Sequence, residues 1–202
     1  DDGSVVTWGP SNAGGSMGSK VQDLASGVVE IFANEAAFAA LKEDGSVVTW
    51  GLSGGGGDSS SVGSSLTSGV VRITSTMTAF AALKSDGSLV AWGGDGGDTS
   101  SLQSQLNSGV VRVYASAYAF AALKSDGKVV AWGYSSAGNP GAKASLLTSG
   151  VSSVVSNNAA FAALKSDGSV VAWGDYGTGG DLGSLDLSSG AVALYSAQAA
   201  FA

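Results

Sequence analysis

Histidine and cysteine are absent from the 202 residues, and proline occurs only twice. Without an imidazole or a thiol, catalysis by a histidine base or by a thiolate nucleophile is excluded. Zinc sites built from these residues and disulfide frameworks are excluded for the same reason. Charged residues are also scarce, at 12% of the chain, which is about half of the usual share. Hydrophobic residues still make up 44%, and 32 residues are glycine.

The few charges are mostly acidic. Nine basic and 16 acidic residues give a net charge of −7, whereas affinity for nucleic acids depends largely on Lys and Arg. We therefore expect no nucleic-acid partner. The sequence shows no membrane-spanning run and no signal peptide, which a mature secreted fragment would lack in any case. Because an acidic, Ser- and Gly-rich, Lys-poor surface fits a saline exterior, we predict a secreted or cell-surface protein without membrane insertion.

A repeated string dominates what is present. A Trp recurs at intervals of 42, 42, 40 and 41 residues, at Trp8, Trp50, Trp92, Trp132 and Trp173. An Asp recurs at the same intervals, at Asp2, Asp44, Asp86, Asp126 and Asp167. A Phe follows the same period, at Phe38, Phe80, Phe120, Phe161 and Phe201. These markers predict a single domain, 1–202, of five units of about 41 residues: 1–39, 40–81, 82–121, 122–162 and 163–202.

Each unit has the pattern of three short strands. For example, residues 110–114 and 119–124 are apolar, and residues 125–128 hold the Asp-Gly dipeptide of a tight hairpin turn. Residues 129–132 then form the returning strand. A Gly- and Ser-rich stretch of about 14 residues leads to the next unit and often carries a Leu pair, such as Leu102 and Leu106. Their spacing of four fits either a helical turn or a bent outer strand.

The strands are apolar on both faces, whereas a surface sheet would alternate polar and apolar residues. Each small sheet is therefore expected to lie between two others, which predicts an all-β fold, a β-propeller of five blades. The chain starts with the strand Val5–Trp8, whose equivalents follow a hairpin turn, and ends with Ala199–Ala202, whose equivalents precede the same turn. We expect these end strands to pair and close the ring. A fragment cut from a longer repeat array is the alternative, since one Ala-Leu-Lys equivalent and an initiator Met are missing.

The string Ala82–Gly93 resembles the repeat of the regulator-of-chromosome-condensation family, with Ala-Leu, then Asp-Gly, an apolar pair and Trp-Gly. The resemblance covers all five units. It is nearest to the bacterial type seen in a secreted β-lactamase-inhibitory propeller. It implies a propeller fold and the binding of proteins through loops, but it transfers no site residue. The chain departs from the family in having five units instead of the usual seven, and in having Ala79 and its equivalents where the family has His.

Several recurrent residues are candidates for sites. The Asp ring is assigned to hairpin turns, and the Lys ring, Lys42, Lys84, Lys124 and Lys165, to solvated strand ends that pair weakly with carboxylates. The five Trp are expected to be core wedges between blades; a carbohydrate-stacking ring is the alternative. The Gly93–Asp98 segment matches a calcium-binding pattern but has no tandem neighbour, so we predict no metal site and leave weak calcium binding open.

Enzymatic activity is not expected. A glycosidase needs two acids of different character across a cleft, whereas the recurrent acids here are equivalent copies on turns. The Gly runs are not followed by the residues of a nucleotide-binding loop. We predict neither a catalytic residue nor a cofactor.

Positions that differ between units are the best candidates for recognition, because binding residues concentrate on loops held by a rigid scaffold. A variable tripeptide precedes each Ala-Phe, and the long loops vary too, with Met17 in one of them. The predicted partner-binding residues are Glu35, Met77, Tyr118, Asn158 and Gln198 in the tripeptides and Tyr134 and Tyr176 in the long loops. The predicted function is a non-enzymatic protein-interaction or structural module. A glycan-binding, lectin-like propeller is the alternative, followed by a glycosidase.

Overall fold

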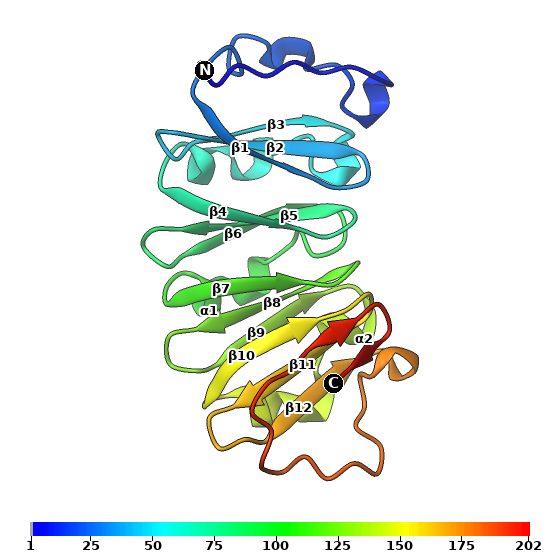
Figure 1. Ribbon diagram of the computed structural model, residues 1–202. Helices are drawn as coiled ribbons and strands as arrows, with labels where there is room; N and C mark the ends of the chain where they lie inside the picture. Colours follow the sequence, from blue (N-terminus) through cyan, green and yellow to red (C-terminus); the bar gives the residue numbers. More distant parts are fainter. Residues whose placement is uncertain (1) are drawn as a thin grey trace. The chain divides into compact units, whose positions relative to one another are not determined.

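A computed structural model describes residues 2–202, and Asp1, the first residue of the first expected unit, lies outside them. The chain divides into two compact units, one ending at Ser108 and the other running from Gly109 to Ala202, and each is described by itself. Both are built from small antiparallel sheets joined by loops with short helical turns (Figure 1).

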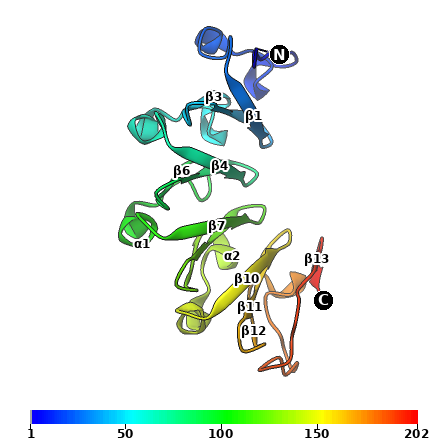
Figure 2. The ribbon, with the colours of Figure 1, turned by 60° about the vertical axis from the view of Figure 1, so that its left-hand side comes forward.

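The first unit contains two three-stranded sheets. Their strands are β1 (Val28–Ala33), β2 (Ala37–Lys42) and β3 (Val47–Gly51), and β4 (Val70–Ser75), β5 (Ala79–Lys84) and β6 (Leu89–Gly93). The two sheets follow one another face to face in both ribbon views (Figures 1 and 2). The loops hold the helical turns η1 (Ser11–Ala13), η2 (Gly18–Lys20), η3 (Ser53–Gly55), η4 (Ser60–Leu66), η5 (Ser100–Leu102) and α1 (Gln103–Leu106).

The second unit contains two further three-stranded sheets and a two-stranded one. Their strands are β7 (Val110–Ala115), β8 (Ala119–Lys124) and β9 (Val129–Gly133), then β10 (Val151–Ser156), β11 (Ala160–Lys165) and β12 (Val170–Gly174), and finally β13 (Ser196–Ala197) and β14 (Ala200–Phe201). Its helical turns are α2 (Ser135–Gly138), η6 (Gly141–Leu147) and η7 (Tyr176–Thr178). The expected all-β fold of repeated antiparallel sheets is confirmed, and the five sheets agree in number with the five expected blades.

The loop Leu pair belongs to a helical turn. Leu102 ends η5, and Leu106 ends α1 with its side chain fully buried. Of the two interpretations that the spacing of four residues permits, the helical turn is therefore the one the chain adopts.

The hairpin between the second and third strands is set by its Asp-Gly turn. In the second sheet, the Asp86 carboxylate accepts hydrogen bonds from the backbone N–H of Ser88 at 2.9 Å and from its hydroxyl at 2.6 Å. Gly87 follows with φ of 78°, a left-handed conformation that costs glycine nothing. The resulting register places Phe80 opposite Trp92.

In each three-stranded sheet the middle strand is almost entirely buried on both faces, as expected. One face of the first sheet carries Ala37, Ala39 and Leu41, which pack against Ile73 and Phe80 of the second sheet. The opposite face, with Phe38, Ala40 and Trp50, packs against the N-terminal segment. Alanine recurs on these faces because a small side chain lets a neighbouring sheet approach closely.

Candidate functional site

The recurrent Asp residues serve the turns. Their carboxylates accept backbone N–H groups two residues further on, as at Asp44 with Ser46 and Asp126 with Lys128. The pKa of Asp86 lies below its ordinary value because the hydroxyl and the backbone N–H of Ser88 both stabilise the ionised carboxylate. Asp98, in the calcium-like segment, bonds the N–H of Ser100 in the same way. Among residues 2–202, no group of three or more acidic side chains could hold a metal ion.

The strand-end lysines also have partners that the prediction did not include. Lys42 donates from Nζ to the backbone carbonyl of Asp23 at 2.8 Å, and Lys84 donates to that of Ser65 at 2.9 Å. Each lysine therefore ties the end of the preceding long loop to its own strand. Carbonyl groups at the end of a helical turn need such partners, because the turn itself leaves them unsatisfied. The predicted weak pairing is present as well, since after the hydrogen bonds from Ser46 and Ser88 the charges of these two lysines help to lower the pKa of Asp44 and Asp86.

Four of the five Trp are core wedges, as predicted. Trp50, Trp92, Trp132 and Trp173 are buried, and each stacks on the Phe opposite it, with ring centroids 5.2–5.5 Å apart. The indole Nε1 of Trp92 donates to the carbonyl of Gly56, and that of Trp50 to the carbonyl of Gly14. These buried and hydrogen-bonded indoles are not available as a carbohydrate-stacking ring.

The first residue of each variable tripeptide forms the strand connection. The Asn34 amide oxygen accepts the backbone N–H groups of Ala36 and Ala37, and its nitrogen donates to the carbonyl of Gly55 at 2.7 Å. Asn157 makes the equivalent set, with Thr178 as its carbonyl partner. In the four three-stranded sheets this position is polar, with Thr76 and Ser116 also bonding the strand connection, whereas the fifth tripeptide begins with Ala197.

The second residues of the tripeptides form a line within each unit. The backbone N–H of Glu35 donates to the carbonyl of Met77 at 3.3 Å in the first unit. In the second unit, Ala117 donates to Asn158 at 2.9 Å, and Asn158 donates to Gln198 at 3.3 Å. The structure thus places Glu35 beside Met77, and Asn158 beside Gln198. We call the surface formed by the second and third tripeptide residues, with the loop residues that follow each Trp-Gly, the tripeptide face.

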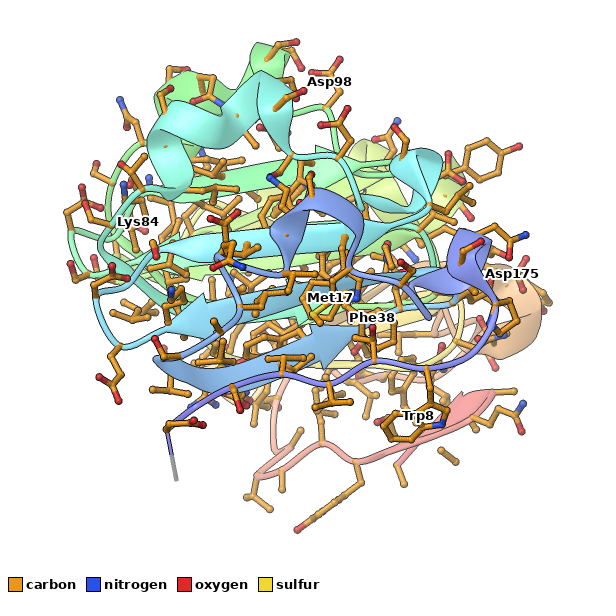
Figure 3. All side chains as sticks on the ribbon, turned by 90° about the horizontal axis from the view of Figure 1, so that it is seen from above. Trp8, Met17, Phe38, Lys84, Asp98 and Asp175 are labelled. Carbon is orange, nitrogen blue, oxygen red and sulfur yellow. The ribbon has the colours of Figure 1, made fainter. Side chains whose placement is uncertain are left out.

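Exposed tyrosines gather on the tripeptide face of the second unit. The backbone N–H of Tyr134 donates to the carbonyl of Tyr118 at 2.9 Å, so these two predicted residues are neighbours, and both side chains are exposed. Tyr176 is exposed at the start of η7, directly after Asp175, whose N–H donates to Ala159 of a tripeptide. Met17, by contrast, packs into the apolar cluster beneath the N-terminal segment, close to Phe38 in Figure 3, and is not a surface anchor.

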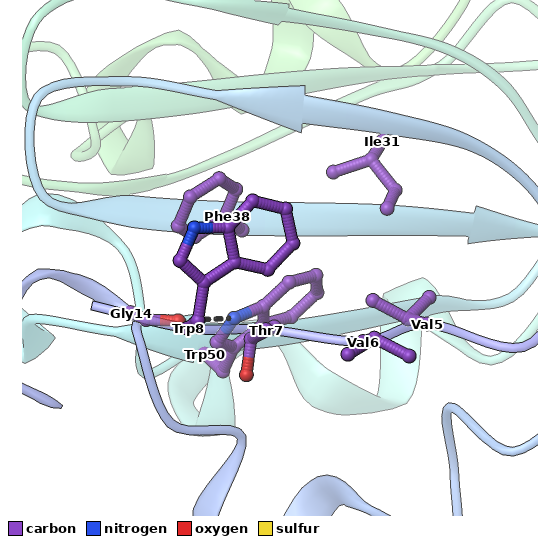
Figure 4. A pocket seen from close by; sticks show the side chains of 8 residues that line it. All are labelled: Val5, Val6, Thr7, Trp8, Gly14, Ile31, Phe38 and Trp50. Atoms are coloured by element: carbon purple, nitrogen blue, oxygen red, sulfur yellow. Dashed lines mark hydrogen bonds between the residues drawn. The ribbon is translucent and has the colours of Figure 1, made fainter.

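The N-terminal segment forms an apolar groove that was not predicted. Residues 5–8 match the third strand of a blade, but within the described part of the first unit no strand pairs with them. The groove has a volume of about 260 Å³ and is lined by Val5, Val6, Thr7, Trp8, Gly14, Ile31, Phe38 and Trp50 (Figure 4). We call it the N-terminal groove.

Comparison between equivalent positions shows how open this groove is. Trp8 is 85% exposed, whereas its equivalent Trp50 is 4% exposed. Ile31 is 44% exposed, whereas its equivalent Ile73 is 2% exposed beneath Ala37 and Ala39. The expectation that all five Trp are core wedges is therefore wrong for Trp8, because no second strand covers it in its own unit.

A second open groove lies at the C-terminal end. It has a volume of about 320 Å³, and its lining includes Ala162, Ala172, Leu194 and Phe201. Here β13 and β14 match the first two strands of a blade, and the sheet has no third strand. We call it the C-terminal groove.

Three solved structures are similar in fold. Prp20p of Saccharomyces cerevisiae, the subject of a structure that also treats its binding to Gsp1p and histones, shares 19% identity at a TM-score of 0.54, covering 78% of this chain and 46% of that one. Yeast RCC1 (Prp20) bound to Kap60 shares 20% sequence identity at a TM-score of 0.52, and the match covers 83% of this chain and 48% of that one. Human WBSCR16 shares 19% sequence identity at a TM-score of 0.50, and the match covers 80% of this chain and 51% of that one. The chain thus spans about half the length of these proteins, and its fold is of the RCC1-like β-propeller type.

A scan against protein-family models and a search of curated proteins find no match. In the part of the chain that the structure describes, no helix is both long and apolar enough to cross a membrane.

Proposed function

We propose that the protein is a non-enzymatic interaction module that binds another protein through its tripeptide face. The observation that carries this proposal is the line of tripeptides, in which a backbone ladder holds exposed and variable side chains at fixed spacing. Tyr118 and Tyr134 provide neighbouring aromatic anchors, the kind of residue that dominates protein interfaces. The similar Prp20 structures concern proteins that bind Gsp1p, histones and Kap60, which is consistent with a protein partner.

The finer assignment follows the bacterial inhibitory type that the sequence resembles. On this proposal the protein is secreted or displayed at the cell surface, and its partner is an enzyme whose entrance the tripeptide face covers. An acidic surface with few lysines supports an exterior location. The lectin-like alternative loses its main support, because the four buried indoles are not available to sugars.

We further propose that the five blades close into a ring when the N-terminal segment pairs with β14. Support comes from the match between the two ends, since residues 5–8 provide a third strand and residues 191–202 provide the first two. Closure would also remove the unpaired strand edges that otherwise invite aggregation.

The interaction proposal can be tested with a purified β-lactamase as the probe. We expect the protein to slow hydrolysis of a chromogenic β-lactam, and we expect the double variant Tyr118→Ala/Tyr134→Ala to weaken this effect by about tenfold or more, as loss of interface anchors usually does. Arg112→Ala, an exposed change on β7 away from the tripeptides, is the matched control. Absence of inhibition by the wild type would contradict the inhibitory assignment.

The broader proposal needs a probe that does not depend on β-lactamase. A photo-crosslinking residue at Tyr118 should capture the same partner as one at Asn158, and one at Arg112 should not. Capture that is equal at all three positions would contradict binding through the tripeptide face.

A further inference from the structure

One Asp-Gly pair of the chain lies outside the hairpin turns. It is Asp95–Gly96, in the loop after β6. An aspartate followed by glycine is open to attack on its carboxyl group by the glycine nitrogen, because glycine has no side chain to hinder the approach. In sequence, all six pairs of the chain are open to this reaction. The other five are the turns of the repeat, which begin at Asp2, Asp44, Asp86, Asp126 and Asp167.

The reaction is a cyclisation followed by hydrolysis. The glycine nitrogen bonds to Cγ of the aspartate, and the carboxyl OH leaves with the amide proton as water, so that a five-membered succinimide ring forms. Water then adds to one of the two ring carbonyls, which gives either aspartate or isoaspartate. In isoaspartate the backbone runs through Cβ and Cγ. The cyclisation needs a carboxyl group that can rotate toward the nitrogen and a nitrogen that can release its proton.

The hairpin turns block both requirements. In the second sheet, the N–H and the hydroxyl of Ser88 hold the Asp86 carboxylate at 2.9 and 2.6 Å, and the N–H of Gly87 donates to the carbonyl of Lys84 at 3.0 Å. The carboxylate is thus directed past the glycine, and the glycine proton is already bonded. The same two backbone hydrogen bonds are present at Asp44–Gly45, Asp126–Gly127 and Asp167–Gly168.

The hydrogen bonds of these turns also keep carboxyl groups ionised. The hydroxyl and the backbone N–H of the serine two residues further on lower the pKa of Asp44, Asp86 and Asp167. A neutral carboxyl group is the better target for the nitrogen, because its OH leaves as water. Ionisation therefore adds to the protection that geometry gives.

Asp95 has neither restraint. Its side chain is exposed, and within residues 2–202 no group donates a hydrogen bond to its carboxylate. Its turn is also of another kind: Gly97 closes it by donating to the carbonyl of Gly94 at 2.8 Å, and Gly96 has φ of 89°, as in a type II turn. The hydrogen bond that closes the turn therefore comes from Gly97, not from the glycine that follows the aspartate. Glycines on both sides of Asp95 let the backbone rotate until nitrogen and Cγ meet.

We propose that Asp95 is a site of succinimide formation and conversion to isoaspartate, and that the Asp-Gly pairs of the hairpin turns are protected from it. Asp95 lies on the tripeptide face, because its N–H donates to Oγ1 of Thr78 at 3.2 Å and that of Gly94 donates to the Thr78 carbonyl at 2.7 Å. Conversion adds one methylene group to the backbone there and shortens the side chain by the same group. The shape of this face and the position of its charge then change while the mass stays constant.

The site can be located with a protease that cleaves before aspartate but not before isoaspartate. In folded protein stored for weeks at about pH 6, conversion at Asp95 leaves peptide 86–97 uncut, whereas conversion at Asp86 leaves peptide 58–94 uncut. We expect peptide 86–97 to accumulate about tenfold faster or more, because the hairpin pair must first open its native hydrogen bonds. Deamidation of an asparagine is told apart by the mass that it adds.

The unfolded chain is the internal control. In concentrated guanidinium chloride the turn hydrogen bonds are absent, so we expect the hairpin pairs to convert at rates similar to that of Asp95. Asp95→Glu retains the charge but would need a six-membered ring, and it should abolish the signal at this position in both states.

A matched pair of variants gives a second measurement. Asparagine closes the same ring faster, with ammonia as the leaving group, and the Asn amide oxygen at position 86 can still accept the N–H of Ser88. We expect Asp95→Asn to deamidate in the folded protein and Asp86→Asn to remain largely intact. Both should deamidate in guanidinium chloride, which shows that the fold causes the difference.

Three results would overturn the proposal. They are equal accumulation of peptides 86–97 and 58–94 in the folded protein, no conversion at Asp95 over a period in which the unfolded chain reacts, and conversion confined to Asp95 in the unfolded chain as well. None of these measurements requires a partner at the tripeptide face, so the interaction proposal is tested independently.

Discussion

Phe80 and Trp92 stack across β5 and β6 with their ring centroids 5.5 Å apart. Both side chains are almost completely buried, and Trp92 also donates its Nε1 hydrogen bond to Gly56. One pair therefore joins two strands of its own sheet and the loop that precedes the sheet, while its apolar faces contact the neighbouring blade.

Removal of the indole should be strongly destabilising. Trp92→Ala leaves a large cavity and an unpaired carbonyl at Gly56, so we expect it to lower the free energy of unfolding by about 3–5 kcal/mol. Urea unfolding followed by circular dichroism measures the change. Tyr176→Ala, an exposed aromatic, is the control and should stay within about 0.5 kcal/mol of the wild type. A loss below about 1 kcal/mol for Trp92→Ala would contradict its place in the core.

The glycine beneath this pair should not tolerate a side chain. Gly56 has φ of 92°, and a Cβ there would lie 2.8 Å from Cδ2 of Phe80. We expect Gly56→Ala to destabilise by about 1–3 kcal/mol through backbone strain and the displaced ring. Gly63, in η4, has no heavy atom within 4 Å of its Cβ position, and its φ is not left-handed. Gly63→Ala should therefore be neutral or slightly stabilising in the same unfolding assay.

The two adjacent asparagines of one tripeptide should differ in their effect on stability. The Asn157 side chain accepts hydrogen bonds from two backbone N–H groups and donates one to the carbonyl of Thr178. Asn157→Ala should therefore lower the free energy of unfolding by about 1–3 kcal/mol. Asn158 is exposed on the tripeptide face, and Asn158→Ala should leave stability within about 0.5 kcal/mol. Thermal unfolding of both variants measures the contrast. Equal destabilisation by the two changes would show that the tripeptide is not divided in this way.

The turn carboxylates should make the fold sensitive to acid. The pKa of Asp86 is lowered in the folded protein, below the ordinary value of 3.8, by hydrogen bonds from Ser88. A lowered folded pKa means that the stabilisation is present above the unfolded pKa and is lost as pH falls through the folded pKa. We expect the urea midpoint of the wild type to be level between about pH 5 and 7 and to fall below about pH 4.

The matched variant is Asp86→Ala, in which this turn has no titrating carboxylate. Its urea midpoint should be lower near neutral pH and should fall less steeply in acid than that of the wild type. If the two proteins lose stability in parallel between pH 5 and pH 3, Asp86 is not a source of the acid sensitivity.

The repeated positions could be predicted from the sequence because the same contact recurs at each of them. The opposition of Phe80 and Trp92, the Asp86 turn and the two-sided burial of Ala81 and Ala82 follow from period, turn chemistry and apolar pattern. The exposed loop residues Tyr118 and Tyr134 were also found through variation, and their adjacency depends on a backbone hydrogen bond that no pattern encodes.

The structure departs from the sequence predictions where a repeated residue has different neighbours in space. Trp8 has the same neighbours in sequence as Trp50, but burial depends on the strand beside it, which Trp8 lacks within its unit. Lys84 was expected only to pair weakly with carboxylates, and its hydrogen bond to the Ser65 carbonyl could not be read from its sequence neighbours because that residue is 19 positions away. Asn34 and Asn157 looked variable because several polar side chains can make the same turn.

One backbone contact between successive blades involves no side chain at all. The backbone carbonyl of a turn glycine accepts a hydrogen bond from the backbone N–H at the start of the next repeat's first strand segment: Gly3 from Val28, Gly45 from Val70, Gly127 from Val151 and Gly168 from Ala191, each at 3.0 Å. This backbone hydrogen bond does not depend on the side chains of the surrounding loops. Duplication or deletion of a whole repeat during evolution would therefore form the same hydrogen bond again. Blade number can thus change in a single genetic step, while the loop sequences diverge independently.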